Sequence, residues 1–317
     1  MTFAEIQSTI TPERAAGAEG NFYKSPKKTI GPGMNKRIQL LRKQSVETQE
    51  SLSIERALIT TKFYKENYGK YSESVMRALN FLEICNQKTI YIGSGELIVG
   101  ERGPAPKSIP TFPELTCHSV EDFHVLNTRD QQQYTISQKD IDIYEREVIP
   151  YWSGRPMRER IFSHVPKEWQ AAYEAGVFTE FMEQRAPGHT ALDGKIYQKG
   201  MLDFKKDINN QIKSLDFLND PEATEKLEQL KAMDISCDAV IVFAERHADL
   251  ALKMAVSEKD TQRKNELKII AEVCHRVPAN APRNLWEAIQ MYWFVHLVTI
   301  TELNGWDAMN PGHFDQH

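Results

Sequence analysis

The sequence predicts a mostly α-helical fold with minor β structure. Apolar residues recur at three- and four-residue steps through most of the chain, which is the spacing of one face of a helix. Strand-like alternation is confined to residues 89–102, and no internal repeat or low-complexity block interrupts the helical pattern. The 317 residues are 41% hydrophobic and 26% charged, an ordinary composition for a globular protein with a sizeable core.

The first third of the chain is expected to contain an arm and three helices. Residues 1–33 are rich in Gly, Pro and Lys and predict a flexible arm, which leaves residues 34–317 as the folded domain. Ser53 and Ser72 are predicted N-caps of the second and third helices. The three helices are expected over residues 34–49, 53–68 and 72–87.

Two irregular segments follow these helices. Residues 89–102 alternate β-branched and polar side chains around Gly93 and Gly95, which predicts a short hairpin. Residues 103–115 contain four prolines and are expected to form an extended loop on the surface.

The remainder is predicted to be helical. Pro221 and Pro282 are expected in first helical turns, where a missing N–H is tolerated. The apolar residues 285–300 are interrupted by polar side chains and are too short to span a bilayer comfortably, so they predict a buried helix. The other helices are expected over residues 138–149, 155–164, 166–176, 201–218, 221–257 and 261–274.

Charge and cysteine usage exclude several classes of protein. A net charge of −5 and a pI near 6.0 give no electrostatic reason to expect nucleic acid or an anionic membrane as a partner. The amino-terminal residues have no apolar core of the signal-peptide type. The widely spaced cysteines suit reduced thiols, so we expect a cytoplasmic protein. They are Cys85, Cys117, Cys237 and Cys274.

Residues 171–190 gather acids, an amide, an arginine and a histidine around a helix break at Gly176. A guanidinium such as that of Arg185 binds carboxylates through two hydrogen bonds, and an imidazole such as that of His189 exchanges protons near neutral pH. A structural turn in which the arginine satisfies backbone carbonyls explains the same residues. The residues alone leave both interpretations open.

Residues 300–317 place polar groups directly after the apolar helix. Asn304 and Gly305 suit the end of a helix, because both tolerate the left-handed backbone found there. Trp306 and Asp307 then fall on the connecting loop, where a carboxylate beside an indole can hold a hydroxyl or ammonium group or relay a proton. The alternative is that the aspartate caps the next turn.

Other kinds of site have weaker support. His313 and His317 have the i, i+4 spacing of a zinc-binding helix, but no third cluster accompanies them. The pairs Cys117-His118 and Cys274-His275 are neighbours along the chain, so their side chains point apart rather than forming a nucleophile and base. No dinucleotide fingerprint, Walker motif or G-x-S-x-G motif is present.

Several short stretches of the sequence, which we call motif words, together resemble the glycyl radical enzymes of the pyruvate formate-lyase superfamily. The two longest are EWQAAYEAGVFTEFMEQRAPGHT, residues 168–190, and AIQMYWFVHLVTITELNGWDA, residues 288–308. The shorter ones are SIERA, RAL, GELIVGERG, PTFPE, KKDI, LDFLND and PG-x-x-DQH. They run from about residue 50 to the end of the sequence. Within the superfamily they are most similar to the hydroxyproline dehydratases.

The resemblance implies a ten-stranded α/β barrel wrapped in helices, of which this chain is the helix-rich N-terminal portion. It implies that this chain binds no cofactor or metal. The full-length enzyme would carry a protein-derived glycyl radical, installed by an activating enzyme that uses S-adenosylmethionine and an iron–sulfur cluster. A cysteine thiyl radical would then take hydrogen from a small-molecule substrate. The other implied partners are the C-terminal half of the barrel and a second copy in a homodimer.

The resemblance also implies a reaction and its residues. In the hydroxyproline dehydratase branch the reaction is loss of water from trans-4-hydroxy-L-proline. Asp307 and His189 would be the catalytic groups that handle protons or hold the substrate, and Phe181 and Trp306 would bind the substrate. The alternative reactions in the superfamily are formate C-acetyltransferase-like cleavage, diol dehydration, and C–S or C–N bond cleavage.

One part of the family pattern is missing from the sequence. The thiyl-bearing cysteine of the family is followed two residues later by Glu, and none of the four cysteines here has Glu at that position. The glycyl radical loop is missing as well. The chain is therefore expected to be a fragment, half of a split gene or a truncated form that is inactive alone. A non-catalytic binding protein that complements a separate second half is the alternative from a different class.

Overall fold

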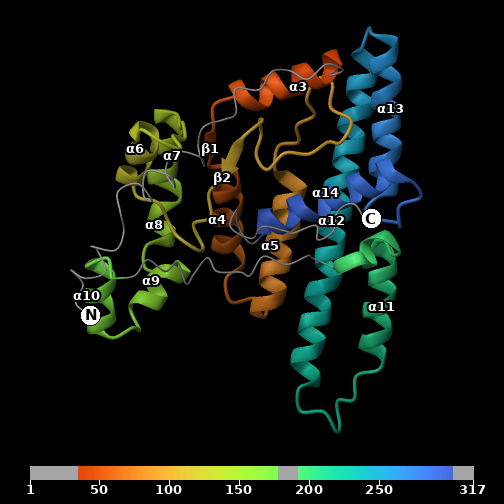
Figure 1. Cartoon of the computed structure of the whole chain (residues 1–317). Coiled ribbons are helices and arrows are strands. Elements are labelled where there is room, and N and C mark those ends of the chain that lie inside the picture. Colours follow the sequence, from red (N-terminus) through yellow and green to blue (C-terminus); the bar gives the residue numbers. More distant parts are fainter. Residues whose placement is uncertain (1–34, 178–191, 303–317) are drawn as a thin grey trace, which may run out of the picture. The chain divides into compact units, whose positions relative to one another are not determined.

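The computed structural model describes residues 35–177 and 192–302 (Figure 1). The chain divides into two units, residues 1–46 and 47–317. In the first unit, α3 (Lys36–Glu47) follows Asn35, whose side-chain oxygen accepts the backbone N–H of Ile38 at 2.9 Å. Such a contact satisfies one of the free N–H groups at a helix start. The helix expected over residues 34–49 is confirmed.

The second unit consists almost entirely of helices. Its described strands are β1 (Ser51–Ser53) and β2 (Ser108–Pro110). Its helices are α4 (Glu55–Asn67), α5 (Glu73–Gln87), α6 (Val120–Thr128), α7 (Gln138–Glu147), α8 (Ile149–Trp152), α9 (Met157–Phe162), α10 (Lys167–Glu174), the 3-10 helix η2 (Asp193–Tyr197), α11 (Met201–Lys213), α12 (Ala223–Ser257), α13 (Thr261–Arg276) and α14 (Leu285–Glu302). The expectation of a mostly helical chain with little sheet is confirmed for the part that the structure describes.

The largest hydrophobic core surrounds α12. This helix packs against α5, α11 and α13, and α14 crosses the same core (Figure 1). Buried alanines on α12 let the neighbouring helices approach closely, because a small side chain leaves room for the facing ridge. They are Ala239, Ala244, Ala248, Ala251 and Ala255. Within the described ranges, no helix combines the length and the apolar character that crossing a membrane would require.

A second core lies between α4, α6, α7 and α8. Phe123 of α6 and Tyr144 of α7 are fully buried and meet edge to face with ring centroids 4.9 Å apart. The indole N–H of Trp152 in α8 donates to the hydroxyl of Thr61 in α4 at 2.8 Å. Because both atoms are buried, this bond fixes α8 on α4 instead of exchanging with water.

The helix α6 was not predicted from the sequence. Ser119 and Asp122 form a capping box there, in which each side chain accepts the backbone N–H of the other, at 3.2 and 2.8 Å. This Ser-x-x-Asp spacing was the local signal for a helix start.

Several predicted caps are corrected by the structure. Ser53 is not an N-cap, because it belongs to β1 and Ile54 holds the cap position of α4. Ser72 is at the N-cap of α5 as expected, but its hydroxyl donates to Glu228 at 2.7 Å and makes no cap hydrogen bond. Pro221 and Pro282 lie before the first residues of α12 and α14, not inside their first turns.

The β structure lies elsewhere than predicted. No strand forms over residues 89–102, so the expected hairpin is wrong. Instead β1 pairs in parallel with β2, which lies in the proline-rich segment that was expected to be a surface loop. Ser108 and Pro110 of β2 are buried, which corrects that expectation too. A proline is acceptable there because it lies at the end of an edge strand.

Gly200 is required by a close backbone contact at the start of α11. The first N–H groups of α11 donate to the carbonyls of Pro278 and Ala279, at 2.8 and 3.0 Å. A Cβ at Gly200 would lie 2.3 Å from backbone atoms of Ala279 and Asn280. The loop before α14 is therefore held against the start of α11 by a position that accepts only glycine.

We expect Gly200→Ala to destabilise the chain by about 1–3 kcal/mol, the usual cost of forcing extra volume into packed backbone. Thermal unfolding measures the effect. Gly194→Ala in η2 is the matched control, because a Cβ there meets no atom within 4 Å. Equal melting temperatures for the two variants would contradict this account of Gly200.

His247 of α12 is a neutral imidazole in the large core. Its Nδ1 lies 2.8 Å from the carbonyl oxygen of Phe243, while its buried Nε2 has no hydrogen-bond partner among the described residues. The rings of Phe243 and Phe294 lie 4.6 and 5.1 Å away. Burial lowers the pKa of His247 to about 3.

The pKa of His247 predicts a dependence of stability on pH. The unfolded chain binds a proton at His247 near pH 6.5, whereas the folded chain does so only near 3, so stability is full above 6.5 and falls as pH drops towards 3. His247→Leu should reduce this slope by up to about 1.4 kcal/mol per pH unit. Urea unfolding between pH 7 and 5 measures it. Leu267→Ala, a control in the same core, should lower stability without changing the slope.

Candidate functional site

The four residues assigned from the sequence lie outside the described residues. They are Phe181, His189, Trp306 and Asp307, in the stretches 178–191 and 303–317. The same holds for Arg185, His313 and His317. What the structure does give is the elements that flank these stretches, of which η2 packs against α14.

The helix α14 carries polar side chains inside an apolar environment. Gln290 is fully buried, and its amide donates to the carbonyl and accepts the N–H of Val99, both at 2.8 Å. The indoles of Trp286 and Trp293 donate to the carbonyls at the two ends of the loop 97–100, at 2.9 and 3.0 Å. The loop backbone is thus satisfied by a helix instead of a partner strand, which is why the hairpin prediction failed.

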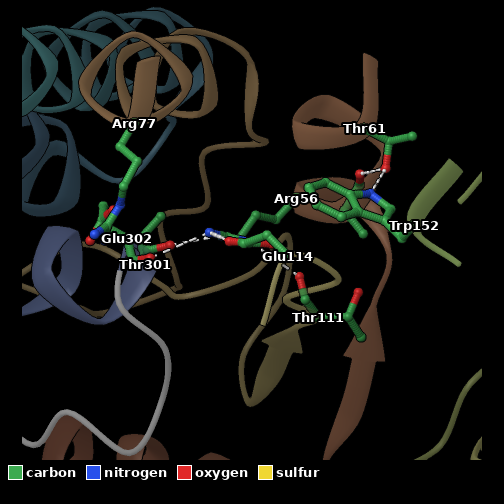
Figure 2. A network of polar contacts seen from close by, with 9 residues as sticks. Arg56, Thr61, Arg77, Thr111, Glu114, Trp152, Thr301 and Glu302 are labelled. Atoms are coloured by element: carbon green, nitrogen blue, oxygen red, sulfur yellow. Dashed lines mark hydrogen bonds and ion pairs between the residues drawn. The ribbon is translucent and has the colours of Figure 1, made fainter. Parts of the chain in front are cut away.

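The C-terminal end of α14 is held by two arginines (Figure 2). Arg56 of α4 is only 4% exposed, and its Nε donates to the carbonyl of Thr301 at 2.7 Å, with a longer contact from Nη2 to the carbonyl of Glu302 at 3.4 Å. Arg77 of α5 donates from Nε and Nη2 to the carboxylate of Glu302, at 3.1 and 2.6 Å. The last described residue of α14 is therefore fixed through both its main chain and its side chain.

A carboxylate from the segment after β2 completes this network. Glu114 forms a two-point ion pair with Arg56, in which Nη1 lies 3.1 Å from Oε2 and Nη2 contacts Oε1. The ring of Phe112 stacks on the guanidinium of Arg56 at 4.0 Å. We call Arg56, Arg77, Glu114 and Glu302 the arginine clamp.

The electrostatics of the clamp favour its charged form. Burial opposes the charge of Arg77, but the nearby carboxylate of Glu302 outweighs it and raises the pKa of Arg77. Burial, with the charge of Glu114, raises the pKa of Tyr64 to about 12, so this phenol beside the clamp stays neutral. All four clamp residues lie inside the motif words and were not assigned from the sequence as site residues.

The clamp also touches the path to the other candidate stretch. The backbone carbonyls of Glu114 and Leu115 accept the N–H groups of Met157 and Arg158, at 2.9 and 3.1 Å, at the start of α9. From there α9 and α10 lead to Gly176, whose φ of +71° ends the helical run as expected from the sequence. The chain returns after residue 191 through η2, which packs against α14.

Lys88, directly after α5, and Glu101, directly after the loop 97–100, have pKa values shifted towards neutrality. Lys88 is 3% exposed, and its ammonium donates to the carbonyls of Glu101 and Arg102, at 3.2 and 2.9 Å. Burial lowers the pKa of Lys88 to about 8, while burial and the charge of Glu96 raise the pKa of Glu101 to about 7. Nothing in the local sequence signals these shifts, because they come from tertiary burial.

The four cysteines are buried or half-buried neutral thiols. Burial raises the pKa of Cys85 to about 12 and those of Cys117 and Cys237 to about 11, and it raises the pKa of Cys274 as well. Cys85, Cys237 and Cys274 are enclosed in helical cores. Cys117 is half-buried and lies 3.8 Å from the hydroxyl of Tyr144. No group of three metal-binding side chains occurs in the described ranges.

A groove of about 930 Å³ lies away from the clamp, beside β1 and the start of α4. Its lining includes the apolar side chains of Leu52, Leu58 and Ile136 and the carboxylates of Glu55 and Asp140. None of its described lining residues was assigned from the sequence as a site residue. We therefore regard α14 and the clamp, not this groove, as the scaffold of the candidate site.

The sequence profile of the pyruvate formate lyase-like family matches residues 34–317. The chain belongs to the pyruvate formate lyase-like family. Among curated members, trans-4-hydroxy-L-proline dehydratase of Clostridioides difficile is 47% identical over 90% of this chain and 36% of its own length. Isethionate sulfite-lyase of Oleidesulfovibrio alaskensis is 28% identical over 96% of this chain and 37% of its own.

A solved structure gives the same result for the fold of this pyruvate formate lyase-like chain. The crystal structure of the C. difficile hydroxyproline dehydratase, with trans-4-hydroxy-L-proline bound, superposes with a TM-score of 0.86 over 90% of this chain and 36% of that one. The chain therefore spans about a third of the length of these relatives.

Gln290 tests how the loop 97–100 is held on α14. We expect Gln290→Leu to destabilise the chain by at least about 2 kcal/mol, because both polar groups of buried Val99 lose their partner. Urea unfolding measures the change. Thr299→Val on the same helix is the control, since that hydroxyl only donates to the carbonyl of Val295 within α14. A Gln290→Leu chain as stable as the control would refute this role.

Proposed function

We propose that this chain is the N-terminal part of a glycyl radical dehydratase that eliminates water from trans-4-hydroxy-L-proline. The observation that carries this proposal is the 47% identity and the TM-score of 0.86 to a hydroxyproline dehydratase with its substrate bound. In this proposal the described helices form part of the outer layer and the pocket wall of a ten-stranded α/β barrel. Residues 34–317 belong to that barrel domain, and residues 1–33 form a flexible arm.

The proposed site residues keep the roles that the sequence analysis assigned. Asp307 and His189 hold the polar groups of the substrate and move protons as the hydroxyl leaves as water. Phe181 packs on the ring of the substrate, and Trp306 binds beside it. The glycyl radical supplies hydrogen abstraction through a cysteine thiyl, and because none of the four cysteines here fits that role, the rest of the enzyme provides it.

The proposed partners follow from the same chemistry. They are the small-molecule substrate, an activating enzyme that uses S-adenosylmethionine and an iron–sulfur cluster, the C-terminal half of the barrel, and a second copy in a homodimer. The proposed location is the cytoplasm. A chain that holds only one wall of the pocket is inactive by itself, and it turns over only when the remaining part is present.

Cleavage of a C–S bond is the second candidate. The isethionate sulfite-lyase is 28% identical over nearly the whole of this chain, so the same scaffold accompanies a different reaction in a relative. Activated complete enzyme decides between the two. Formation of pyrroline carboxylate from hydroxyproline supports the dehydratase, whereas sulfite from isethionate with no pyrroline carboxylate rejects it.

Asp307→Asn in the complete, activated enzyme should lower kcat by about 10²-fold or more, because general acid–base groups contribute on that scale. The glycyl radical yield by electron paramagnetic resonance should stay at the wild-type value, which shows an intact fold. Asp142→Asn, an exposed position on α7, is the control. Wild-type turnover in Asp307→Asn would remove this residue from the mechanism.

A further inference from the structure

We propose that the groove beside β1 is a second binding site, which takes a free alkyl diamine, a chain of methylene groups with an ammonium group at each end. The described residues that line it fall between positions 51 and 143 and belong mainly to β1, α4, α7 and the segments next to them (Figure 1). The proposal does not depend on the reaction proposed above, because none of these lining residues has a role in it.

The groove has the size and the apolar surface of a small-molecule site. Its volume of about 930 Å³ lies within the usual range of ligand pockets, about 300–1,000 Å³. Leu58 and Ile59 of α4 and Ile143 of α7 line it and are only partly buried, so they leave apolar surface in the groove. Such a surface favours the burial of methylene groups from water.

The charged side chains of the groove are all negative. Glu55 in the first turn of α4 and Asp140 in the first turn of α7 line it, whereas none of its described lining residues is Lys, Arg or His. Neither carboxylate forms an ion pair with a described residue. The positive end of a helix carries only about half a unit charge, so the two helix starts offset these carboxylates in part. The groove therefore attracts cations.

Neutral donors orient both carboxylates and leave one oxygen of each available. The N–H and the hydroxyl of Thr89 donate to Oε1 of Glu55, at 3.0 and 2.6 Å. The hydroxyl of Ser137 donates to Oδ2 of Asp140 at 2.6 Å. The second oxygen of each carboxylate makes no hydrogen bond to a described residue. An ammonium group supplies both the missing donors and the opposite charge.

The combination of two carboxylates with apolar side chains selects a diamine over other ligands. An anion would be repelled, and a neutral apolar molecule would remove both carboxylates from water without giving them a partner, which is costly. A metal ion would make no contact that uses the apolar side chains, and the part of the chain that the structure describes holds no group of three metal-binding residues. A diamine can pair with carboxylates on two helices and cover the apolar side chains with its methylene groups.

Three ligands of equal length test this recognition on the wild-type chain. They are 1,6-diaminohexane, hexylamine and 1,6-hexanediol, which share a six-carbon chain and differ in their number of ammonium groups. Methyl NMR titration at fixed low ionic strength measures the affinities, because Ile59 and Ile143 line the groove. We expect saturable shifts of both residues and an affinity for the diamine about two- to fivefold above that for hexylamine, the gain from one more partly exposed ion pair. The diol should show no saturable binding.

Two variants test the carboxylates. Glu55→Gln and Asp140→Asn remove one charge each and keep an oxygen that accepts the same hydrogen bonds, and thermal unfolding without ligand checks that both chains fold. Each variant should bind 1,6-diaminohexane about two- to fivefold more weakly. Asp142→Asn is the matched control and should leave the affinity unchanged, because Asp142 lies on the same helix α7, is exposed and does not line the groove.

The outcomes separate the alternatives. No saturable binding of the diamine overturns the proposal, and so does an equal loss of affinity in Asp142→Asn, which would show unspecific attraction to a negative surface. Equal affinity for the diamine and hexylamine overturns the recognition of two ammonium groups. Trilysine, titrated at the same ionic strength, distinguishes a free amine from a protein partner. If it binds more tightly than the diamine and is weakened by the same two variants, the groove docks a basic peptide and the proposal is wrong.

Discussion

A buried guanidinium at the end of a buried helix is the constraint on which this part of the structure depends. Arg56 reaches Thr301 across 245 residues of sequence, so α4 and α14 must be brought together before either polar group is satisfied. Placing Glu114 opposite Arg56 requires β2 to pair with β1 in the observed register. The short sheet, which buries little by itself, thereby sets the geometry of a network that joins three distant segments.

Much of the helical architecture was accessible from sequence, because periodic apolar residues report the face that a helix buries. The helices from α11 to α14 agree with expectation to within a few residues. The position of the β-sheet could not be predicted in the same way. The backbone of residues 97–100 finds its partners on Gln290, Trp286 and Trp293, and no local pattern reveals that a helix will take the place of a strand.

For the candidate site, too, some residues could be predicted from the sequence and others could not. The family motifs predicted the stretches that carry His189 and Asp307, whereas the clamp residues lie inside motifs that indicated only family resemblance. Arg56 lies in SIERA and Glu114 in PTFPE. Their importance comes from their burial and from partners far along the chain. A single sequence reports neither how buried a residue is nor which distant residues it contacts. Clamp residues of this kind need a structure to be found.

The three side-chain bonds between α14 and the loop 97–100 have a mechanical consequence. The indoles of Trp286 and Trp293 and the amide of Gln290 bind the loop along about two turns of α14. Rotation of α14 about its axis would therefore move the loop as well. Lys88, directly after α5, donates hydrogen bonds to the next two carbonyls, those of Glu101 and Arg102. A rotation of α14 would therefore also move the backbone that carries the ionisable side chain of Glu101.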